Sequence, residues 1–300
     1  MMDDCSSGPL PNGRVSTLIE ALPYMRQWSG KTMVVKYGGA AMTNPQLQHS
    51  VMKDLVLLHY LGVRIVLVHG GGPRISDMME RLGHQPQFIN GLRVTDRATM
   101  DIVQMVLVGS IGQDLVSLIN SEGGKAVGVS GKDAGLIVAD RKQSPDGDLG
   151  FVGEVNHIET HLIDTLNEAG YMVVLTPLGT DKAGNSYNIN ADTVACAVAE
   201  ALQAEKLVIL SDVPGVLRDV EDESSLISAL TTEDVRRLVA ASAIAGGMIP
   251  KVEAAMKAVL NGVRRVHLID GRREHSLLLE LFTEQGIGTM ITVEGDFTDE

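Results

Sequence analysis

Hydrophobic positions along the chain follow two patterns. Short runs rich in Val, Ile and Leu are typical of buried strands, and longer segments with apolar residues three and four positions apart are typical of amphipathic helices. The runs that predict strands are 32–37, 63–69, 125–130, 171–176, 206–211, 265–270 and 288–293. The helical patterns cover 45–61, 73–83, 95–121, 157–169, 190–203, 231–241, 250–262 and 275–285. This alternation predicts parallel strands, right-handed crossovers and helices on both faces of a sheet.

The predicted fold class is therefore α/β, with an open, mainly parallel central sheet sandwiched by helices. Between residues 136 and 154, two apolar runs flank a Pro-Asp-Gly-Asp turn, which predicts a β-hairpin. The polar segment 179–189 is the candidate for a hinge or a lobe boundary. We predict one lobe over 29–196 and a second lobe over 197–300.

The N-terminal segment has its own pattern. Residues 1–12 are predicted to be a disordered tail, and the apolar spacing predicts a helix over 14–28. Pro23 lies inside that helix and should kink it, because proline removes a hydrogen bond and crowds the preceding turn. Two interpretations of 1–28 stay open: a helix that lies on its own domain, or an arm that embraces another subunit.

Composition narrows the class of protein. Of the 300 residues, 44% are hydrophobic and 3% are aromatic, which suits the aliphatic core of a parallel α/β protein. The net charge of −13 argues against nucleic acid or an anionic membrane as a partner, because both require a basic face. No apolar run approaches the roughly 18 residues of a membrane span, and the acidic start lacks a secretory signal.

Cysteine and histidine give no sign of a disulfide framework or a metal site. Two cysteines, Cys5 and Cys196, are too few for either, which indicates a reducing compartment. His157 and His161 lack a third ligand and the HExxH order, so we interpret them as part of a solvated helix face and predict no metal ligands. We expect a cytoplasmic protein, or a protein of the plastid stroma if the source is a plant or an alga.

Three consecutive glycines, Gly70 to Gly72, stand where a predicted strand passes into a helix. Neither GxGxxG nor GxxxxGK[ST] fits them, but a bare backbone can approach an anion and direct N–H groups at it. Pro73 suits the first helical position, and the helix adds its positive end. A His-Gly-Gly-Gly run also forms the oxyanion hole of some esterases. That interpretation fails, because Lys132 replaces the glycine that a nucleophile elbow around Ser130 requires.

Three cationic side chains stand where a predicted strand ends, where a helix begins or just after a turn. Lys36 ends the first predicted strand beside Gly38 and Gly39, where it can reach an anion or simply extend into solvent at the sheet edge. Lys251 lies in the first turn of a helix, where a cation opposes the helix dipole by roughly 0.3–1 kcal/mol. A bound phosphate would satisfy both the helix end and this lysine. Arg93 follows a turn, and its planar fork suits a carboxylate, a phosphate or an ordinary salt bridge.

Polar residues crowd two further positions. Asn188, Asn190 and Asp192 stand at the start of an apolar helix. Helix capping explains one of them, and Asp192 enters a buried environment where it needs a cationic partner. Asp212 opens an Asp-Val-Pro-Gly segment after another predicted strand, which is either a tight turn or the lining of a nucleotide site. Because ligands of open α/β sheets collect at the carboxyl ends of strands, we expect these groups to meet.

Together these residues predict an enzyme that transfers a phosphoryl group. Two lysines, an arginine and glycine-rich turns position and neutralise anions, which is most of the catalysis that phosphoryl transfer needs. No catalytic base is evident. A carboxylate acceptor explains this, because its pKa of about 4 leaves it ionised at neutral pH. Lysines and Mg²⁺ would relieve the repulsion between the two anions.

In these motifs the chain resembles the amino acid kinase family, and within it the kinases that act on N-acetyl-L-glutamate. The resemblance covers about residues 14–293. The motifs are Val-Lys-Tyr-Gly-Gly-Ala at 35–40, His-Gly-Gly-Gly-Pro at 69–73, Asn-Gly-Leu-Arg-Val-Thr-Asp at 90–96, Tyr-Asn-Ile-Asn-Ala-Asp at 187–192 and Gly-Gly-Met-Ile-Pro-Lys at 246–251. The resemblance implies that ATP, with Mg²⁺, phosphorylates the side-chain carboxylate and gives N-acetyl-L-glutamyl 5-phosphate for arginine or ornithine biosynthesis.

The resemblance also implies a role for each matching residue. Lys36 and Lys251 would stabilise the transferring phosphoryl group, and Asp192 would hold both lysines in place. The implied acetylglutamate site comprises Gly71, Gly72, Arg93, Asn188 and Asn190. The implied nucleotide site comprises Gly38, Gly39, Asp212, Val213, Gly215 and Leu217.

Regulation follows from the same resemblance. The chain resembles family members that carry a kinked N-terminal helix. Those members form ring-shaped hexamers, built as trimers of dimers, and arginine inhibits them. By this resemblance, the effector arginine would be surrounded by Tyr24, Lys206, His267, Glu280 and Gly286. Relatives in oxygenic phototrophs also bind a trimeric PII signalling protein, which is a further candidate partner.

Two rival functions stay open. One is another carboxylate or carbamate kinase of the same fold, which turnover assays with different acceptors would separate. The other is a non-catalytic scaffold that senses arginine. The intact set of Lys36, Asp192 and Lys251 disfavours the scaffold.

Overall fold

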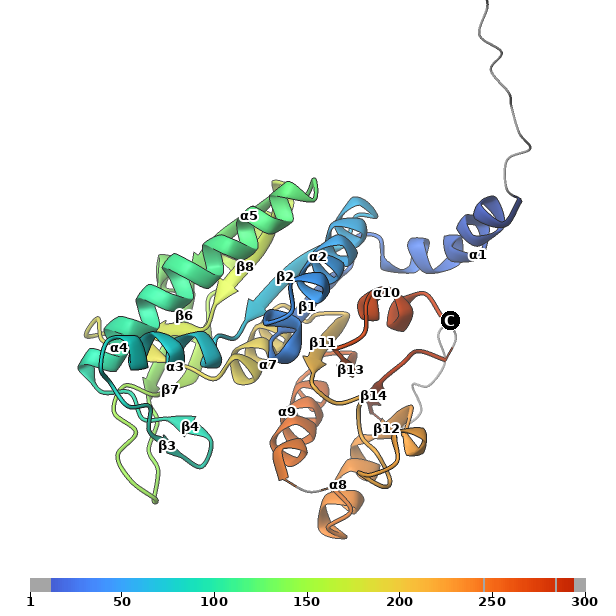
Figure 1. Ribbon diagram of the computed structural model, residues 1–300. Coiled ribbons are helices and arrows are strands. Elements are labelled where there is room, and N and C mark those ends of the chain that lie inside the picture. The colour runs from blue at the N-terminus through green and yellow to red at the C-terminus, as the bar shows by residue number, and fades with distance from the viewer. Residues whose placement is uncertain (1–11, 245, 284, 294–300) are drawn as a thin grey trace, which may run out of the picture.

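A twisted central sheet organises the computed structural model, which describes residues 12–244, 246–283 and 285–293 (Figure 1). Within these residues, the sheet has eight strands. In spatial order they are β12 (Ala229–Thr231), β14 (Thr289–Thr292), β13 (Arg265–Asp270), β11 (Lys206–Ser211), β1 (Thr32–Tyr37), β2 (Arg64–His69), β8 (Met172–Thr176) and β5 (Ala126–Ser130). All neighbours are parallel except β13 and β14, which are antiparallel. The predicted mainly parallel sheet is confirmed.

Helices cover both faces of this sheet. One face carries α6 (His161–Glu168), α7 (Ala191–Ala201), α8 (Thr232–Ala240) and α9 (Ile249–Leu260). The other face carries α2 (Pro45–Tyr60), α3 (Gly72–Arg81), α4 (Arg97–Gln104), α5 (Gln113–Ser121) and α10 (Ser276–Leu281). Alternate residues of β1 enter the two cores, since Val34 packs in one and Met33 and Val35 in the other. Burial on both faces explains why these strands are continuous apolar runs in the sequence.

A second, four-stranded sheet lies beside the first helix layer. It contains the predicted hairpin, β6 (Ile137–Arg141) and β7 (Gly153–Ile158), which is antiparallel as expected. It also contains β9 (Leu178–Thr180) and β10 (Ser186–Asn188). The segment 179–189, predicted to be a polar hinge loop, is therefore mostly a short hairpin of this sheet. One continuous main sheet joins the two predicted lobes, whose boundary stays a prediction.

Shorter elements complete the fold. A two-stranded ribbon pairs β3 (Phe88–Ile89) with β4 (Leu92–Arg93). The single-turn helices are η1 (Gly39–Met42), η3 (Asp133–Gly135), η4 (Glu223–Ser225) and η5 (Gly246–Met248).

One helix start was predicted wrongly. The pattern placed a helix over 157–169, but β7 continues to Ile158 and α6 begins at His161. His157 therefore lies in a strand and His161 at the start of a helix, so the two histidines do not share a helix face. Pairing with β6 decides the structure of residues 157 and 158, and that tertiary contact leaves no trace in local spacing.

The predicted helix over 95–121 is present as one continuous helical run, but its middle is not α-helical. Residues Met105–Gly112 (η2) form a π-helical stretch between α4 and α5. By length and composition alone, Arg97–Ser121 is also able to cross a membrane, which the sequence analysis overlooked. Within the described residues, its side chains Val106, Leu107, Ile111 and Leu115 are buried in the core under the sheet. A core helix of this kind passes the same test of length and composition.

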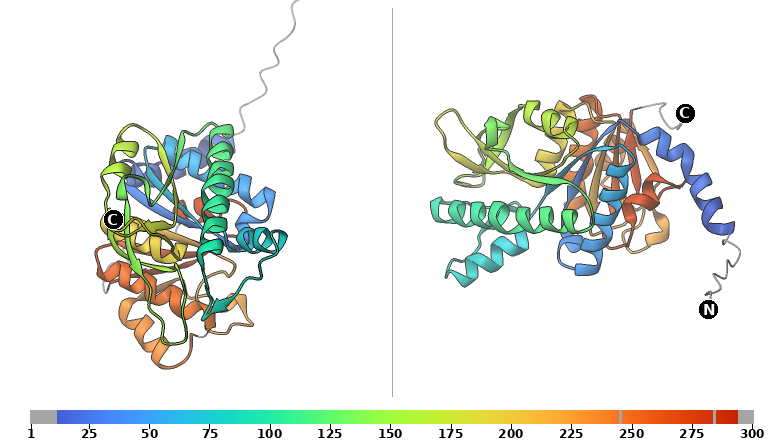
Figure 2. Two further views of the ribbon diagram at one scale, coloured as in Figure 1. Left: turned by 90° about the vertical axis from the view of Figure 1, so that its left-hand side faces the viewer. Right: turned by 90° about the horizontal axis from the view of Figure 1, so that it is seen from above.

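The predicted N-terminal helix is present as α1 (Asn12–Trp28), with Pro23 inside it, and the kink expected at Pro23 stays a prediction. Residues 1–11 of the predicted tail lie outside the described residues. The helix projects from the edge of the molecule beside α10 (Figures 1 and 2). Its C-terminal end is anchored where the buried Trp28 donates from Nε1 to the carbonyl of Leu281 at 3.3 Å. The apolar side chains of the preceding turns are exposed, although most of them belong to the stripe that predicted the helix. They are Val15, Leu18, Ile19 and Leu22, with exposed fractions of 47–64%.

Candidate active site

Three strands deliver their carboxyl ends to one place at the sheet edge. β1 ends beside Lys36, β2 ends at the glycine run Gly70 to Gly72, and β11 ends beside Asp212. Parallel pairing of β1 with both neighbours aligns these ends. The meeting of groups that the sequence predicted is therefore a direct result of parallel topology.

Lys36, Asp192 and Lys251 form an ionic cluster, which we call the lysine–aspartate triad. Lys36 Nζ lies 3.0 Å from Asp192 Oδ1, and Lys251 Nζ donates to Asp192 Oδ2 at 2.9 Å. Their side chains are only 11%, 19% and 24% exposed for Lys36, Asp192 and Lys251. Burial raises the pKa of Asp192, but the two lysine charges outweigh burial and hold the pKa below its ordinary value. The expected cationic partner of Asp192 is thus a pair of lysines.

Local structure sets the position of each member of the triad. Asn190 is the N-cap of α7, because its Oδ1 accepts from the N–H groups of Asp192 at 2.8 Å and Thr193 at 3.2 Å. Asp192 therefore lies in the first turn of α7. Lys251 lies in the first turn of α9, where a proline stands and no side chain caps the helix. The start of α9 therefore directs the positive end of the helix dipole toward the triad, where an anion would be stabilised.

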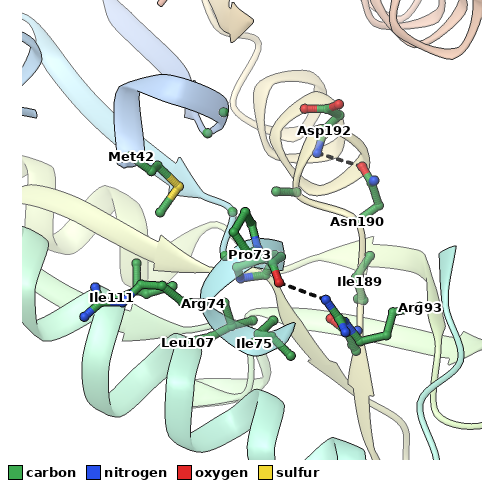
Figure 3. A pocket seen from close by; sticks show the side chains of 18 of the residues that line it. Met42, Pro73, Arg74, Ile75, Arg93, Leu107, Ile111, Ile189, Asn190 and Asp192 are labelled. Carbon is green, nitrogen blue, oxygen red and sulfur yellow. Dashed lines mark hydrogen bonds between the residues drawn. The ribbon is translucent and has the colours of Figure 1, made fainter. Parts of the chain in front are cut away.

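A cavity of about 280 Å³ opens on the first-lobe side of the triad (Figure 3). All five residues that the resemblance assigned to acetylglutamate line it, although Asn190 also caps α7. They are Gly71, Gly72, Arg93, Asn188 and Asn190. Gly38, assigned to the nucleotide, lines this cavity as well. A site this small and partly polar suits an amino-acid-sized ligand.

Arg93 is held in a fixed orientation inside the cavity. Its Nη2 donates to the carbonyl of Gly72 and to Ser76 Oγ, both at 2.8 Å, and its guanidinium lies 4.8 Å from the centre of the Phe88 ring. Within the described residues, Arg93 forms no ion pair although it is only 8% exposed. The ordinary salt bridge is therefore not what the structure shows, and an anionic ligand would supply the missing charge.

Asn188, the last residue of β10, lines the same cavity. Its Nδ2 donates to Thr95 Oγ1 at 3.2 Å, and Thr95 Oγ1 donates to the carbonyl of Arg93 at 2.9 Å. This chain of hydrogen bonds fixes Asn188 relative to the strand that carries Arg93. The amide and the guanidinium therefore keep a constant separation, as recognition of a small polar ligand requires.

A second cavity of about 410 Å³ opens on the other side of the triad. Asp212, Val213, Gly215 and Leu217, all assigned to the nucleotide, line it together with Lys251. Lys36 and Gly39 line both cavities. The triad thus stands where two cavities meet, one lined by the first lobe and one by the second.

Gly39 allows the two lobes to touch at this junction. Asp212 Oδ1 accepts from the N–H of Ala40 at 2.5 Å, which ties the turn after β1 to the strand end of β11. Gly39 has φ +65°, and a Cβ there would lie 2.2 Å from Asp212 Oδ1. Only glycine satisfies both the backbone conformation and the close approach.

Replacing Gly39 by alanine is expected to destabilise the protein and weaken nucleotide binding. The positive φ alone costs about 1 kcal/mol, and displacement of Asp212 adds to it. Gly83→Ala is the matched control, because Gly83 has φ +80° with open space around its Cα. Urea unfolding and nucleotide titration would measure both effects. Equal losses in the two variants would show that the contact with Asp212 contributes nothing.

The five residues assigned to an arginine effector gather beneath α1, away from the triad. The ring of Tyr24 packs against Phe282 with centroids 6.1 Å apart, and Lys206 Nζ lies 4.3 Å from the centre of the Trp28 ring. On the adjoining α10, Glu280 forms a short contact with His267 Nδ1 and accepts from the N–H of Gly288 at 3.0 Å. A Cβ on Gly286, which has φ +59°, would lie 2.8 Å from Glu280 Oε2.

Burial and charge set the protonation of this cluster. Burial, together with the nearby charge of Lys206, lowers the pKa of His267 to about 4, so its imidazole is neutral at neutral pH. Burial raises the pKa of Glu280, but its hydrogen bond with His267 and the surrounding donors hold the pKa below the ordinary value. Neutral His267 donates from Nδ1, which leaves Nε2 as an acceptor. That buried Nε2 finds no hydrogen-bond partner among the described residues.

Sequence reasoning missed several residues that shape the site. Ser76 and Phe88 orient Arg93, and His69 and Thr176 form a buried pair beneath the glycine run. One of them left a signal: Asn90-Gly91 is a frequent turn of tight hairpins, and it places Phe88 opposite Arg93. The others depend on contacts between distant segments.

Comparison with known proteins agrees with this geometry. The chain matches the model of the amino acid kinase family over residues 31–270. Acetylglutamate kinase of Desulforamulus reducens is 52% identical over 282 residues, which are 94% of this chain and 98% of the relative.

Two solved structures of N-acetylglutamate synthase from Neisseria gonorrhoeae are also similar. The complex with coenzyme A and N-acetyl-glutamate has a TM-score of 0.83 and 30% identity, and the match covers 93% of this chain and 63% of that chain. The complex with coenzyme A and L-arginine has a TM-score of 0.76 and 28% identity over 93% and 65%. The chain belongs to the amino acid kinase family and, within it, to the acetylglutamate kinases, enzymes that phosphorylate N-acetylglutamate in arginine biosynthesis.

Proposed function

We propose that the phosphoryl group passes from ATP to the side-chain carboxylate of N-acetyl-L-glutamate where the two cavities meet. The observation that carries this proposal is that Lys36 and Gly39 line both cavities beside the buried Asp192. A group that moves from one cavity to the other must pass the triad. The product is N-acetyl-L-glutamyl 5-phosphate.

Each cavity fits one of the two substrates. In the first cavity, Arg93 supplies an uncompensated cation, and Asn188 and Asn190 supply amides, as a ligand with carboxylate and acetamido groups requires. In the second cavity, Asp212 to Leu217 form a partly apolar lining that suits a nucleotide base and ribose. We assign acetylglutamate to the first cavity and ATP to the second.

The chemistry at the junction is mostly electrostatic. The acceptor carboxylate has a pKa of about 4, so it attacks without a base, and its repulsion from the phosphates is the main barrier. Lys36 and Lys251 offset this repulsion from two sides, and Asp192 keeps both ammonium groups in place before substrate binds. The N–H groups of Gly71 and Gly72, at the start of α3, stabilise charge on the transferring group.

We propose Mg²⁺ as the cofactor, carried by the nucleotide. Within the described residues, no group of three or more His, Cys, Asp or Glu side chains is placed to hold a metal ion. The ion would therefore rely on phosphate oxygens for most of its ligands. Among the described residues that line the second cavity, Asp212 supplies the carboxylate, whose Oδ1 already accepts from the N–H of Ala40. When bound, Mg²⁺ would neutralise charge on the phosphates.

A coupled assay of ATP turnover tests the proposal. N-acetyl-L-glutamate should support turnover far better than glutamate, aspartate or carbamate. Glutamate and aspartate would bring an ammonium beside Arg93, and carbamate has no acetamido group for the amides of Asn188 and Asn190. Preferred turnover of carbamate or aspartate would contradict the proposal and favour another kinase of the same fold.

Replacing Arg93 by alanine is expected to raise the KM for acetylglutamate by roughly 10²-fold, since a charged hydrogen bond to a carboxylate is lost. The KM for ATP should change little, because Arg93 does not line the second cavity. Arg81→Ala, an exposed arginine at the end of α3, is the matched control. An unchanged KM for acetylglutamate would remove Arg93 from the substrate site.

We also propose that arginine inhibits the enzyme from the cluster beneath α1. The carboxylate of Glu280 and the acceptor Nε2 of His267 are suited to bind the N–H donors of a guanidinium. N-acetylglutamate synthase, a similar structure, is known in complex with L-arginine. Because Tyr24 and Trp28 of α1 border the cluster, an effector there would act on the N-terminal helix.

We propose that α1 joins dimers into a hexamer. The exposed apolar stripe of Val15, Leu18, Ile19 and Leu22 has no cover within the described chain, and a helix with such a stripe requires an apolar partner. Pairing of this stripe with the same helix of another subunit would bury it and would link the effector cluster to the assembly.

Deleting residues 1–22 is expected to reduce the hexamer to dimers and to weaken inhibition by arginine, while turnover without arginine stays near normal. The deletion keeps Tyr24 and Trp28, so the effector cluster retains its own side chains. Sedimentation velocity and inhibition curves would measure both effects. The double variant Leu18→Glu/Ile19→Glu should behave in the same way, and Glu20→Gln on the same helix should not. A hexamer that survives both changes would rule out the stripe as the contact.

We also propose a location for the protein and a further partner. Few cysteines support a reducing location, which is the cytoplasm or the plastid stroma. A PII signalling protein is proposed as a partner on the family resemblance, and co-sedimentation with a purified PII protein would test it.

A further inference from the structure

His69 is the last residue of β2 and directly precedes the glycine run. Its side chain is completely buried. Nδ1 lies 2.9 Å from the carbonyl oxygen of Gly70, and Nε2 lies 3.0 Å from Thr176 Oγ1 at the end of β8. Gly70 lines the first cavity, but His69 and Thr176 line neither cavity, so the proposed mechanism leaves this histidine without a task.

These two contacts fix the tautomer of His69. A carbonyl oxygen can only accept a hydrogen bond, so Nδ1 must carry the proton and donate it to Gly70. Nε2 is then unprotonated and accepts from the hydroxyl of Thr176. Burial lowers the pKa of the imidazole to about 4, so His69 remains neutral at neutral pH.

The hydrogen bond to Gly70 determines where the next N–H points. The peptide between Gly70 and Gly71 is planar and trans, so its N–H points away from its C=O. Because the carbonyl of Gly70 points at the buried imidazole of His69, the N–H of Gly71 points away from that imidazole. Gly70 and Gly71 both line the first cavity, which is the open space that this peptide adjoins.

The π-helical stretch supports this arrangement from below. Its last residue, Gly112, lies beside the pair, since a Cβ there would make ordinary van der Waals contacts with Thr176 Oγ1 at 3.5 Å and His69 Nε2 at 3.6 Å. Leu107 and Ile111 pack directly against Gly71, where a Cβ would lie 2.4 Å and 2.6 Å from their terminal carbons. The peptide is thus fixed by a hydrogen bond on one side and by packing on another. A π-helical insertion often occurs at functional sites.

We propose that His69 is a positioning residue for phosphoryl transfer, which aims the N–H of Gly71 at the transferring group through the carbonyl of Gly70. Thr176 holds the imidazole in the tautomer that allows this. The inference rests on the proposed function, because it assumes that the N–H of Gly71 stabilises charge in the transition state.

Two variants of His69 separate its two hydrogen bonds. The amide nitrogen of asparagine takes the place of Nδ1 and keeps the bond to Gly70. The amide of glutamine reaches the place of Nε2 and keeps only the bond to Thr176. Losing an oxyanion donor lowers kcat by about 10²–10³-fold, and a donor that is misdirected rather than removed should lower it by about 10–100-fold.

We therefore expect His69→Gln to lose about 10–100-fold in kcat with little change in either KM, and His69→Asn to recover most of that loss. A purely structural histidine would give a different result, because both variants would then lose stability and activity together. Equal kcat values for the two variants, or a loss confined to KM, would overturn the inference.

A measurement on the unaltered enzyme covers the case in which the variants fold poorly. In protein labelled with ¹⁵N-histidine, the two-bond nitrogen–proton spectrum should show His69 protonated at Nδ1 and bare at Nε2, with the Nε2 signal shifting in Thr176→Val. A proton on Nε2 would overturn the inference. This spectrum does not depend on the acceptor, so a failure of the proposed acetylglutamate reaction would appear in the turnover assay alone.

Discussion

Replacing Lys251 by alanine should lower kcat by about 10³-fold, the range seen when a cation that stabilises phosphoryl transfer is lost. Its ammonium lies in the first turn of α9, where folding gains nothing from a cation, and it contacts Asp192 at the border of the second cavity. Because the nucleotide would also contact the lining of Asp212 to Leu217, its affinity should change much less than kcat. Single-turnover kinetics with acetylglutamate would measure the chemical step.

Lys257→Ala is the matched control for this variant. Lys257 lies on the same helix but is exposed and lines neither cavity of the active site. Any loss that arises from altered helix propensity or net charge should appear in both variants. If Lys251→Ala retained near-normal turnover, the junction of the cavities would not be the site of transfer.

Replacing Asp192 by asparagine should lower both activity and stability. The change keeps the shape of the side chain but leaves two lysines in a largely buried place without their counter-ion. Removing one partner of a fully buried ion pair costs about 3–5 kcal/mol, and the partial exposure of these side chains puts the expected loss near the lower end. The ammonium groups should move apart, so kcat should fall by roughly 10²-fold.

Nucleotide should compensate for part of this loss in stability. Phosphate anions placed between the lysines would replace the missing carboxylate charge, so a non-hydrolysable ATP analogue should stabilise Asp192→Asn more than the unaltered enzyme. Asp148→Asn, which alters an exposed ion pair with Arg141, is the control. Urea unfolding with and without the analogue would measure the difference. If the analogue stabilised Asp192→Asn and the unaltered enzyme equally, the nucleotide phosphates would not bind between the two lysines.

Much of the fold was predictable because burial on both faces of the sheet makes the strands continuous apolar runs. All seven predicted strands are present, and the hairpin of β6 and β7 follows its turn residues. The strands that the sequence did not predict are β3, β4, β9, β10 and β12, which have two or three residues each. Such strands are too short to show a period, and their pairing partners define them.

The sequence also gave no sign of the π-helical stretch Met105–Gly112. Its apolar residues continue the spacing of α4 and α5 closely enough that the pattern predicts one regular helix. Only the three-dimensional neighbours, the glycine run and the pair of His69 and Thr176, show why the register changes there.

The sequence predicted the charged residues of the candidate site but not the residues that hold the site in position. Lys36, Asp192 and Lys251 were recognisable because each residue type is costly where it stands unless an anion or a counter-ion accompanies it. Ser76 and Thr176 carry no such cost, so nothing in the sequence marked them, and Phe88 was marked only indirectly, by the Asn90-Gly91 turn that places it opposite Arg93. Their effect appears only when distant segments meet.

The unbroken main sheet has a consequence for how the enzyme can move. β1 of the first lobe and β11 of the second are hydrogen-bonded neighbours over four residue pairs, and their ends hold Lys36 and Asp212. Opening and closing around substrates cannot use a flexible tether between the lobes, since none separates them here. We expect the motion to use a change in the twist of the shared strands instead, which would bring the lobes back to one resting shape after each product leaves.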